Sequence, residues 1–158
     1  MREETQIRQR LVKHLEGGEA FMPVTEMVQK ISFDDINTRP GNLPYSFFEL
    51  FYHIVFTQKD IVKFTCSDDY TEPRWPDYYW PKEKTCKSLE EWKTLKAEYV
   101  ADRERLKKFL LDEENSLSQA VKNGEGEQSL LREVLLVIEH SAYHTGQMLV
   151  VLRLLNLH

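Results

Sequence analysis

The 158-residue chain carries 26 acidic and 21 basic residues, a formal net charge of −5 at pH 7. Its Lys and Arg residues are interleaved with Asp and Glu, so no concentrated positive face exists for phosphate, and nucleic acid is not an expected partner. The most apolar segment, residues 148–157, is interrupted by an arginine and an asparagine, which argues against a membrane span. Cys66 and Cys86 form neither a CxxC pair nor a disulfide framework and suit a reducing cytoplasm. The length predicts one domain over residues 1–158.

The N-terminal third of the chain predicts one helix and a second, shorter one. Apolar residues at Ile7, Leu11 and Leu15 form a helical stripe that ends at the consecutive glycines 17–18. Apolar residues recur at helical spacing again over residues 24–31. A stretch rich in proline, glycine and asparagine follows, which predicts a surface connection before the next helix.

A long helix is predicted to begin after Ser46, because Ser46 and Glu49 stand in the S-x-x-E arrangement of a capping box. Helical periodicity carries this helix to about Cys66 and turns His53 inward. Residues 67–87 combine three prolines with several Trp and Tyr residues, so they predict an ordered aromatic loop. We expect this loop to pack over the end of the bundle.

Two further helices complete the predicted fold. Ser88 and Glu91 repeat the capping box before a charged helix that reaches about Glu114. Ser129 is the predicted cap of a last helix that runs to about Leu155. Because no stretch alternates with the period of a β-strand, the predicted class is all-α: a four-helix bundle with an extra short helix and an aromatic loop.

Three inward histidines predict a metal site. His140 and His144 are four residues apart, so their rings project from one side of the last helix toward the bundle interior. Such a pair alone is often coincidence, but His53 is predicted to face inward from a different helix. Each buried neutral imidazole must satisfy both ring nitrogens, and one shared ion satisfies all three together. Three protein ligands are fewer than the four of a closed zinc site, which leaves a position open for chemistry.

The spacing also disfavours two common kinds of metal site. The segment reads H-S-A-Y-H, with Ser141 where a zinc peptidase of the H-E-x-x-H type carries its glutamate. Neither histidine of the pair has a glutamate three residues before it, as carboxylate-rich di-iron bundles require. Three imidazoles suit one divalent transition metal ion, zinc or nickel first and iron or copper next. Gln147 and Thr57, each about one turn from a histidine, are candidate contacts of the metal-bound rings.

Three motifs of the chain resemble the DinB/YfiT-like family of metal-binding four-helix bundles. They are P-Y-S-F-F-E-L-F-Y-H-I at residues 44–54, W-P-D-Y-Y-W-P at 75–81 and E-H-S-A-Y-H-T-G-Q at 139–147. The resemblance implies a metal triad of His53, His140 and His144. It also implies a reaction between a low-molecular-weight thiol and a small electrophile, as in the family's thiol S-transferases, and pairing of two chains as a homodimer.

Two functional hypotheses follow from these residues. The first is a metal-dependent enzyme that transfers a small thiol to an electrophile or hydrolyses a small substrate, with no residue assigned as general base. The second is a non-catalytic, stress-associated binding protein in which the same metal captures a ligand or ties two helices together. If replacing His144 lowered the stability of the protein, and the parent had no detectable activity, the second hypothesis would be favoured.

Overall fold

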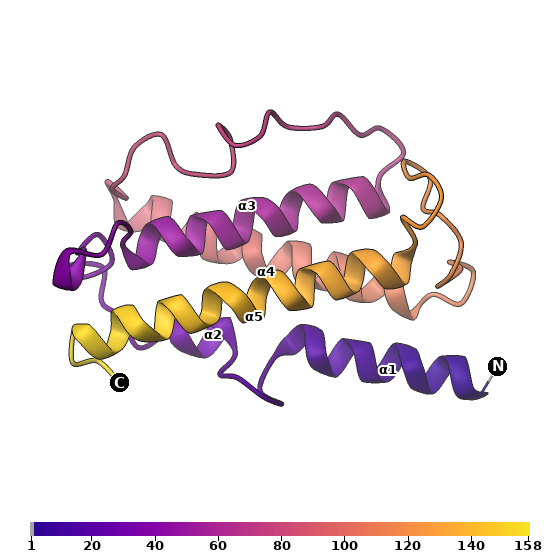
Figure 1. Cartoon of the computed structure of the whole chain (residues 1–158), viewed down its shortest axis with the longest axis horizontal. Coiled ribbons are helices and arrows are strands. Elements are labelled where there is room, and N and C mark those ends of the chain that lie inside the picture. The colour runs from indigo at the N-terminus through magenta and orange to yellow at the C-terminus, as the bar shows by residue number, and fades with distance from the viewer. Residues whose placement is uncertain (1) are drawn as a thin grey trace.

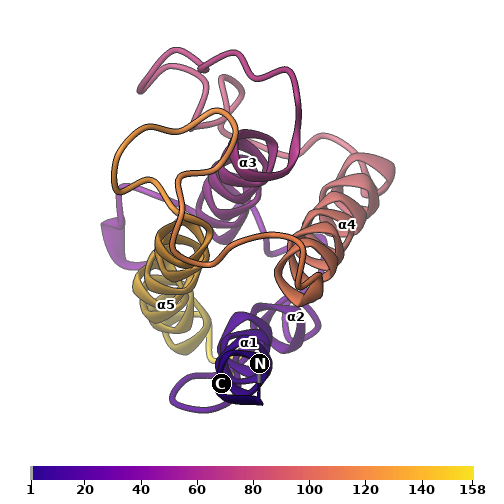
Figure 2. The same cartoon turned by 90° about the vertical axis from the view of Figure 1, so that its right-hand side faces the viewer.

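A computed structural model describes residues 2–158, which form a bundle of long helices. The long helices are α1 (Arg2–Glu16), α3 (Phe47–Cys66), α4 (Leu89–Leu111) and α5 (Leu130–Leu154), with the short helix α2 (Val24–Met27) and the 3-10 turn η1 (Pro40–Asn42) between α1 and α3. Viewed end-on, the long helices occupy the four corners of the bundle (Figure 2). No β-strand forms within residues 2–158, so the predicted all-α class is confirmed. Over the same residues, no helix is both long and apolar enough to cross a lipid bilayer.

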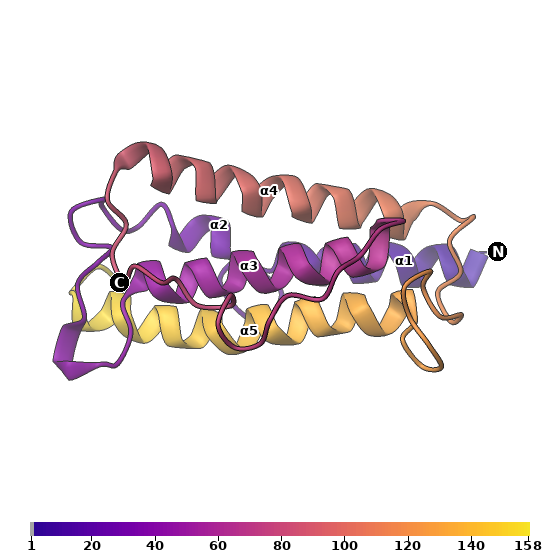
Figure 3. The ribbon, with the colours of Figure 1, turned by 90° about the horizontal axis from the view of Figure 1, so that it is seen from above.

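Helices α1 and α5 run in one direction and α3 and α4 in the other (Figure 1). Because α3 and α4 are parallel, the connection between them must return along the whole length of the bundle. Figure 3 shows residues 67–88 following α3 from one end to the other. The expectation that this aromatic loop covers the end of the bundle is therefore wrong, because a parallel helix pair needs a lengthwise connection.

Serine caps start the three longest helices, as predicted, but only one capping box is complete. Ser46 accepts a hydrogen bond from the Glu49 amide at 3.2 Å, and the Glu49 carboxylate accepts one from the Ser46 amide at 2.8 Å. Ser129 caps α5 through the amide of residue 132. At the start of α4, Ser88 accepts from the Glu91 amide, but the Glu91 carboxylate bonds the amide of residue 87 instead.

The N-terminal helix buries a different set of residues from the predicted stripe. Leu11 and Leu15 lie in the core, but Ile7 is 44% exposed and Arg8 is only 1% exposed. The helix ends at Glu16, and the next residue, Gly17, has a φ of 80°, in the left-handed region that favours glycine.

The second helix is shorter than predicted and ends at Met27. After it, the amides of Gln29 and Lys30 bond carbonyls three residues back, so the chain continues in tighter single turns. Ile31 nevertheless reaches the core, as its spacing predicts.

The guanidinium of Arg8 explains why α4 ends at Leu111 rather than near Glu114. In a longer helix the carbonyl of Leu110 would accept the amide of Glu114. Instead, the Leu110 carbonyl accepts a hydrogen bond from Nη1 of Arg8 at 2.6 Å. The carbonyl of Asp112 accepts a second hydrogen bond from the same atom at 3.2 Å. A side chain 102 residues away in sequence therefore bonds the end of this helix, where the Asp112 carboxylate also accepts the amide proton of Glu114.

The interior contains two apolar clusters separated by a polar layer. One cluster takes its residues from α2 and from one half of each of α3, α4 and α5, and the other from α1 and the opposite halves. Along the three long helices, the intervals between the clusters hold these buried polar residues: Gln58, Arg103, Ser141, His144 and Thr145. The bundle therefore places polar chemistry near its middle, where α3 faces α5.

Candidate metal centre

Two helices bring three imidazoles together at this middle level. His53 lies two turns after the cap of α3, and His140 and His144 lie one turn apart on α5. One ring nitrogen from each histidine lies within 4.8 Å of the others. The ring centroids are 4.5–4.8 Å apart. The three residues that the sequence singles out are thus neighbours in space, and together they could bind one metal ion.

The facing nitrogens have a separation that suits a shared ion. Nε2 of His53 and Nε2 of His140 are 3.0 Å apart. Two imidazole nitrogens, each about 2.1 Å from one tetrahedral ion, would be about 3.4 Å apart. Little movement of either ring is needed for both nitrogens to contact the same ion.

Hydrogen bonds on the outer side of two rings direct their other nitrogen inward. Nδ1 of His53 lies 2.9 Å from the carbonyl oxygen of Tyr79. A carbonyl only accepts, so this nitrogen carries the proton and Nε2 keeps its lone pair. Nδ1 of His144 donates in the same way to Oε1 of Gln147, at 2.5 Å. The predicted contact of Gln147 with a histidine ring is therefore confirmed, and Trp80 stacks parallel on His53 at 4.2 Å.

Burial keeps the three imidazoles neutral. Burial, together with the nearby His144 and His53, lowers the pKa of His140 to about 3. The pKa of His53 is lowered chiefly by burial, which the hydrogen bond to Tyr79 partly opposes. That of His144 is also lowered by burial, against the bond to Gln147. At neutral pH all three rings therefore offer lone pairs, and a metal ion would not have to displace charge-bearing protons.

Sequence reasoning missed the part that the aromatic loop plays here. The sequence predicted only an ordered aromatic loop at the end of the bundle, whereas the loop contributes a backbone carbonyl and a stacked ring to His53. A backbone carbonyl carries no residue-type signal, so spacing could not have revealed it. The other candidate contact, Thr57, has a buried hydroxyl without a hydrogen-bond partner among the described residues.

The two cysteines lie outside the metal centre, since the cluster of possible ligands among residues 2–158 consists of the three histidines. Burial raises the pKa of the Cys66 thiol to about 11, and burial together with the nearby Glu91 does the same for Cys86. Neither side chain is a ready thiolate at neutral pH.

We expect both thiols to react slowly with iodoacetamide in the folded protein. At pH 8 the folded chain should be alkylated about a hundredfold more slowly than the chain in denaturant, because only the thiolate attacks. The rate should rise about tenfold for each pH unit between 7 and 10, since the raised pKa values lie above this range. A plateau near pH 8.5, measured by mass spectrometry of quenched samples, would contradict the raised pKa values.

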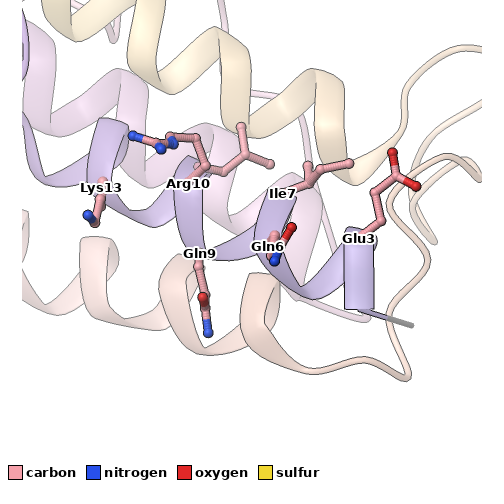
Figure 4. A pocket seen from close by; sticks show the side chains of 7 residues that line it. Glu3, Gln6, Ile7, Gln9, Arg10 and Lys13 are labelled. Atoms are coloured by element: carbon pink, nitrogen blue, oxygen red, sulfur yellow. The ribbon is translucent and has the colours of Figure 1, made fainter.

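One of the open hollows of the surface lies away from the histidines. It has a volume of about 440 Å³ and is lined by residues of α1 alone, several of them charged or amide side chains (Figure 4). None of the three histidines lines this hollow, so it is not part of the metal centre.

Comparison with known proteins agrees with this arrangement. None of the curated proteins and none of the solved structures matches the chain. A family model described as the DinB superfamily matches residues 19–148, a span that covers most of the chain and includes all three histidines. With its bundle of long helices and its buried histidine cluster, the chain belongs to the DinB superfamily.

Proposed function

We propose that this protein binds one divalent transition metal ion on His53, His140 and His144, and uses it to transfer a low-molecular-weight thiol to a small electrophile. The observation that carries this proposal is the 3.0 Å separation of the two Nε2 atoms, in a cluster where two rings are turned inward by outer hydrogen bonds. Neutral imidazoles at this spacing support a shared metal-ligand set.

The composition of the cluster supports an anionic co-substrate. Its members within residues 2–158 are three imidazoles and no carboxylate, so they neutralise none of the ion's charge. A divalent ion held there would supply the positive charge that keeps a thiol ionised as thiolate, or that lowers the pKa of a bound water. The thiol must come from outside, because Cys66 and Cys86 lie away from the cluster.

The chain's own residues would hold and shield this site. Tyr79 and Gln147 fix the orientation of the His53 and His144 rings, and Trp80 covers one face of His53. Tyr143 lies edge-on to His144 with its ring centroid at 4.9 Å, and its side chain is 67% exposed.

The test is a transfer assay with metal-loaded protein. Bacillithiol or another small thiol is mixed with a fluorogenic chloro-bimane electrophile, and the rate is compared with that of His144→Ala and of His14→Ala, an exposed histidine on α1. We expect thiol-dependent transfer in the parent and in His14→Ala, and at most the uncatalysed rate in His144→Ala. Metal-loaded protein that neither binds the thiol nor accelerates transfer would disprove the proposal.

A second candidate function is that of a metal-containing binding protein without catalysis. The observation that favours it is that His53 belongs to α3 and the other two ligands to α5, so an ion would join two helices. A large fall in the melting temperature of His144→Ala, with no transfer or ester hydrolysis in the parent, would support this role.

A further inference from the structure

The carboxylate of Asp60 accepts hydrogen bonds from two tyrosine hydroxyls of the aromatic loop. Tyr70 donates to Oδ1 at 2.9 Å, and Tyr79 donates to Oδ2 at 2.5 Å. A carboxylate only accepts hydrogen bonds, so both phenols are donors. Asp60 lies on α3, and both tyrosines belong to the loop that follows that helix.

Tyr79 joins this carboxylate to the metal centre. Its hydroxyl bonds Asp60, while its backbone carbonyl accepts the Nδ1 proton of His53 at 2.9 Å. Asp60 follows His53 by seven residues, which is two helical turns and about 10 Å along the same side of α3. Tyr79 thus lies lengthwise against α3, with one end at Asp60 and the other at His53.

The surroundings of Tyr79 leave its ring little freedom. It is 9% exposed and packs edge-on against Phe56 at 5.1 Å and Trp75 at 4.8 Å. Burial raises the pKa of its phenol, and the hydrogen bond to Asp60 raises it further, so the group stays a neutral donor. With the ring held at its hydroxyl end, the adjoining carbonyl is held as well.

We propose that Asp60 is a positioning residue of the metal centre: by holding Tyr79 it fixes the carbonyl that orients His53 and directs Nε2 toward His140. This inference rests on the proposed metal function and deepens it. Hydrogen-bond partners behind a metal-bound histidine set the orientation of its ring, and removing them typically costs about 10- to 100-fold in metal affinity.

Tyr70 provides a matched control, because it makes the same kind of bond to the same carboxylate. Its ring packs on Phe64 at 5.2 Å, further along α3 from His53. If Asp60 only anchored the loop, loss of either hydroxyl would have the same effect. If Asp60 acts through Tyr79, then Tyr79→Phe should disturb His53, and Tyr70→Phe should not.

The first measurement needs no metal. In metal-free, 15N-labelled protein, NMR reports the rate at which the Nδ1 proton of His53 exchanges with water. We expect Asp60→Asn and Tyr79→Phe to raise this rate at least about tenfold, and Tyr70→Phe to leave it within about twofold, because only the first two loosen the carbonyl. Equal rates in Tyr79→Phe and Tyr70→Phe would overturn the proposal.

The second measurement is metal affinity, obtained by competition with a coloured chelator, together with the visible spectrum of the cobalt-loaded protein. Asp60→Asn and Tyr79→Phe should weaken binding about 10- to 100-fold and shift the cobalt bands, with melting temperatures near that of Tyr70→Phe. A parent that binds metal, with variants of unchanged affinity and spectrum, would overturn the role of Asp60 and leave the metal function intact. A parent that binds no metal would overturn the metal function, while proton exchange would still decide whether Asp60 positions His53.

Discussion

Replacing His53, His140 and His144 together by alanine is expected to reduce the metal content from about one ion per chain to none. The change removes every member of the possible ligand cluster found in residues 2–158. Plasma mass spectrometry of purified, untagged protein measures the stoichiometry. Each single replacement should weaken binding by about 3 kcal/mol, roughly a hundredfold, since one of three coordinating nitrogens is lost.

The matched control is His14→Ala, since His14 is exposed on α1 and should leave the metal content unchanged. A chelator should lower the melting temperature of the parent but not that of the triple variant, because only a protein that binds the ion is stabilised by it. Metal retained by the triple variant would place the site elsewhere. No metal in the parent after reconstitution would leave three core histidines, of which His53 and His140 hydrogen-bond to each other.

Arg8→Met is expected to destabilise the fold by about 3 kcal/mol, which is about 6–12 °C in melting temperature for a chain of this size. The guanidinium is buried, and besides Leu110 and Asp112 it bonds the carbonyl of Asn115 at 2.7 Å and Glu4 at 2.6 Å. Methionine keeps an unbranched apolar stem, but it is shorter and donates no hydrogen bond. The carbonyls at the end of α4 would then be buried without partners, which is the main cost.

Arg10→Met is the control for this change, because Arg10 is exposed two residues further along α1. Arg8→Lys should be intermediate, since one ammonium cannot reach the carbonyls that the planar guanidinium spans. Thermal unfolding followed by circular dichroism measures all three variants. Equal stability of Arg8→Met and Arg10→Met would show that this arginine does not hold α1 against α4.

The homodimer, the small thiol and the reducing compartment stay predictions.

For the fold, local sequence signals were sufficient where the structural feature depends on a few neighbouring residues. Ser46 with Glu49, and Ser129 alone, predicted helix starts correctly, because a cap is satisfied within one turn. The i, i+4 spacing of His140 and His144 likewise placed both rings on one side of α5, since that follows from helix geometry.

Local signals failed where a distant group competes for the same atoms. Helical spacing favoured Ile7 as a core residue, but the structure buries Arg8, because the carbonyls at the end of α4 need donors there. The incomplete box at Ser88 has a local origin instead, because the Glu91 carboxylate accepts a hydrogen bond from the amide of residue 87 rather than from that of Ser88.

By itself, the sequence determined the all-α class, where the three longest helices begin and which three histidines point inward, since caps and periodicity act over a few residues. Only the tertiary structure decided that His53 meets His140 with a 3.0 Å separation of their nitrogens, because this depends on how α3 packs against α5. It also decided that the loop runs lengthwise, and that Tyr79 joins Asp60 to His53. These contacts use a backbone carbonyl and the packing of separate segments, which no local pattern of residue types encodes.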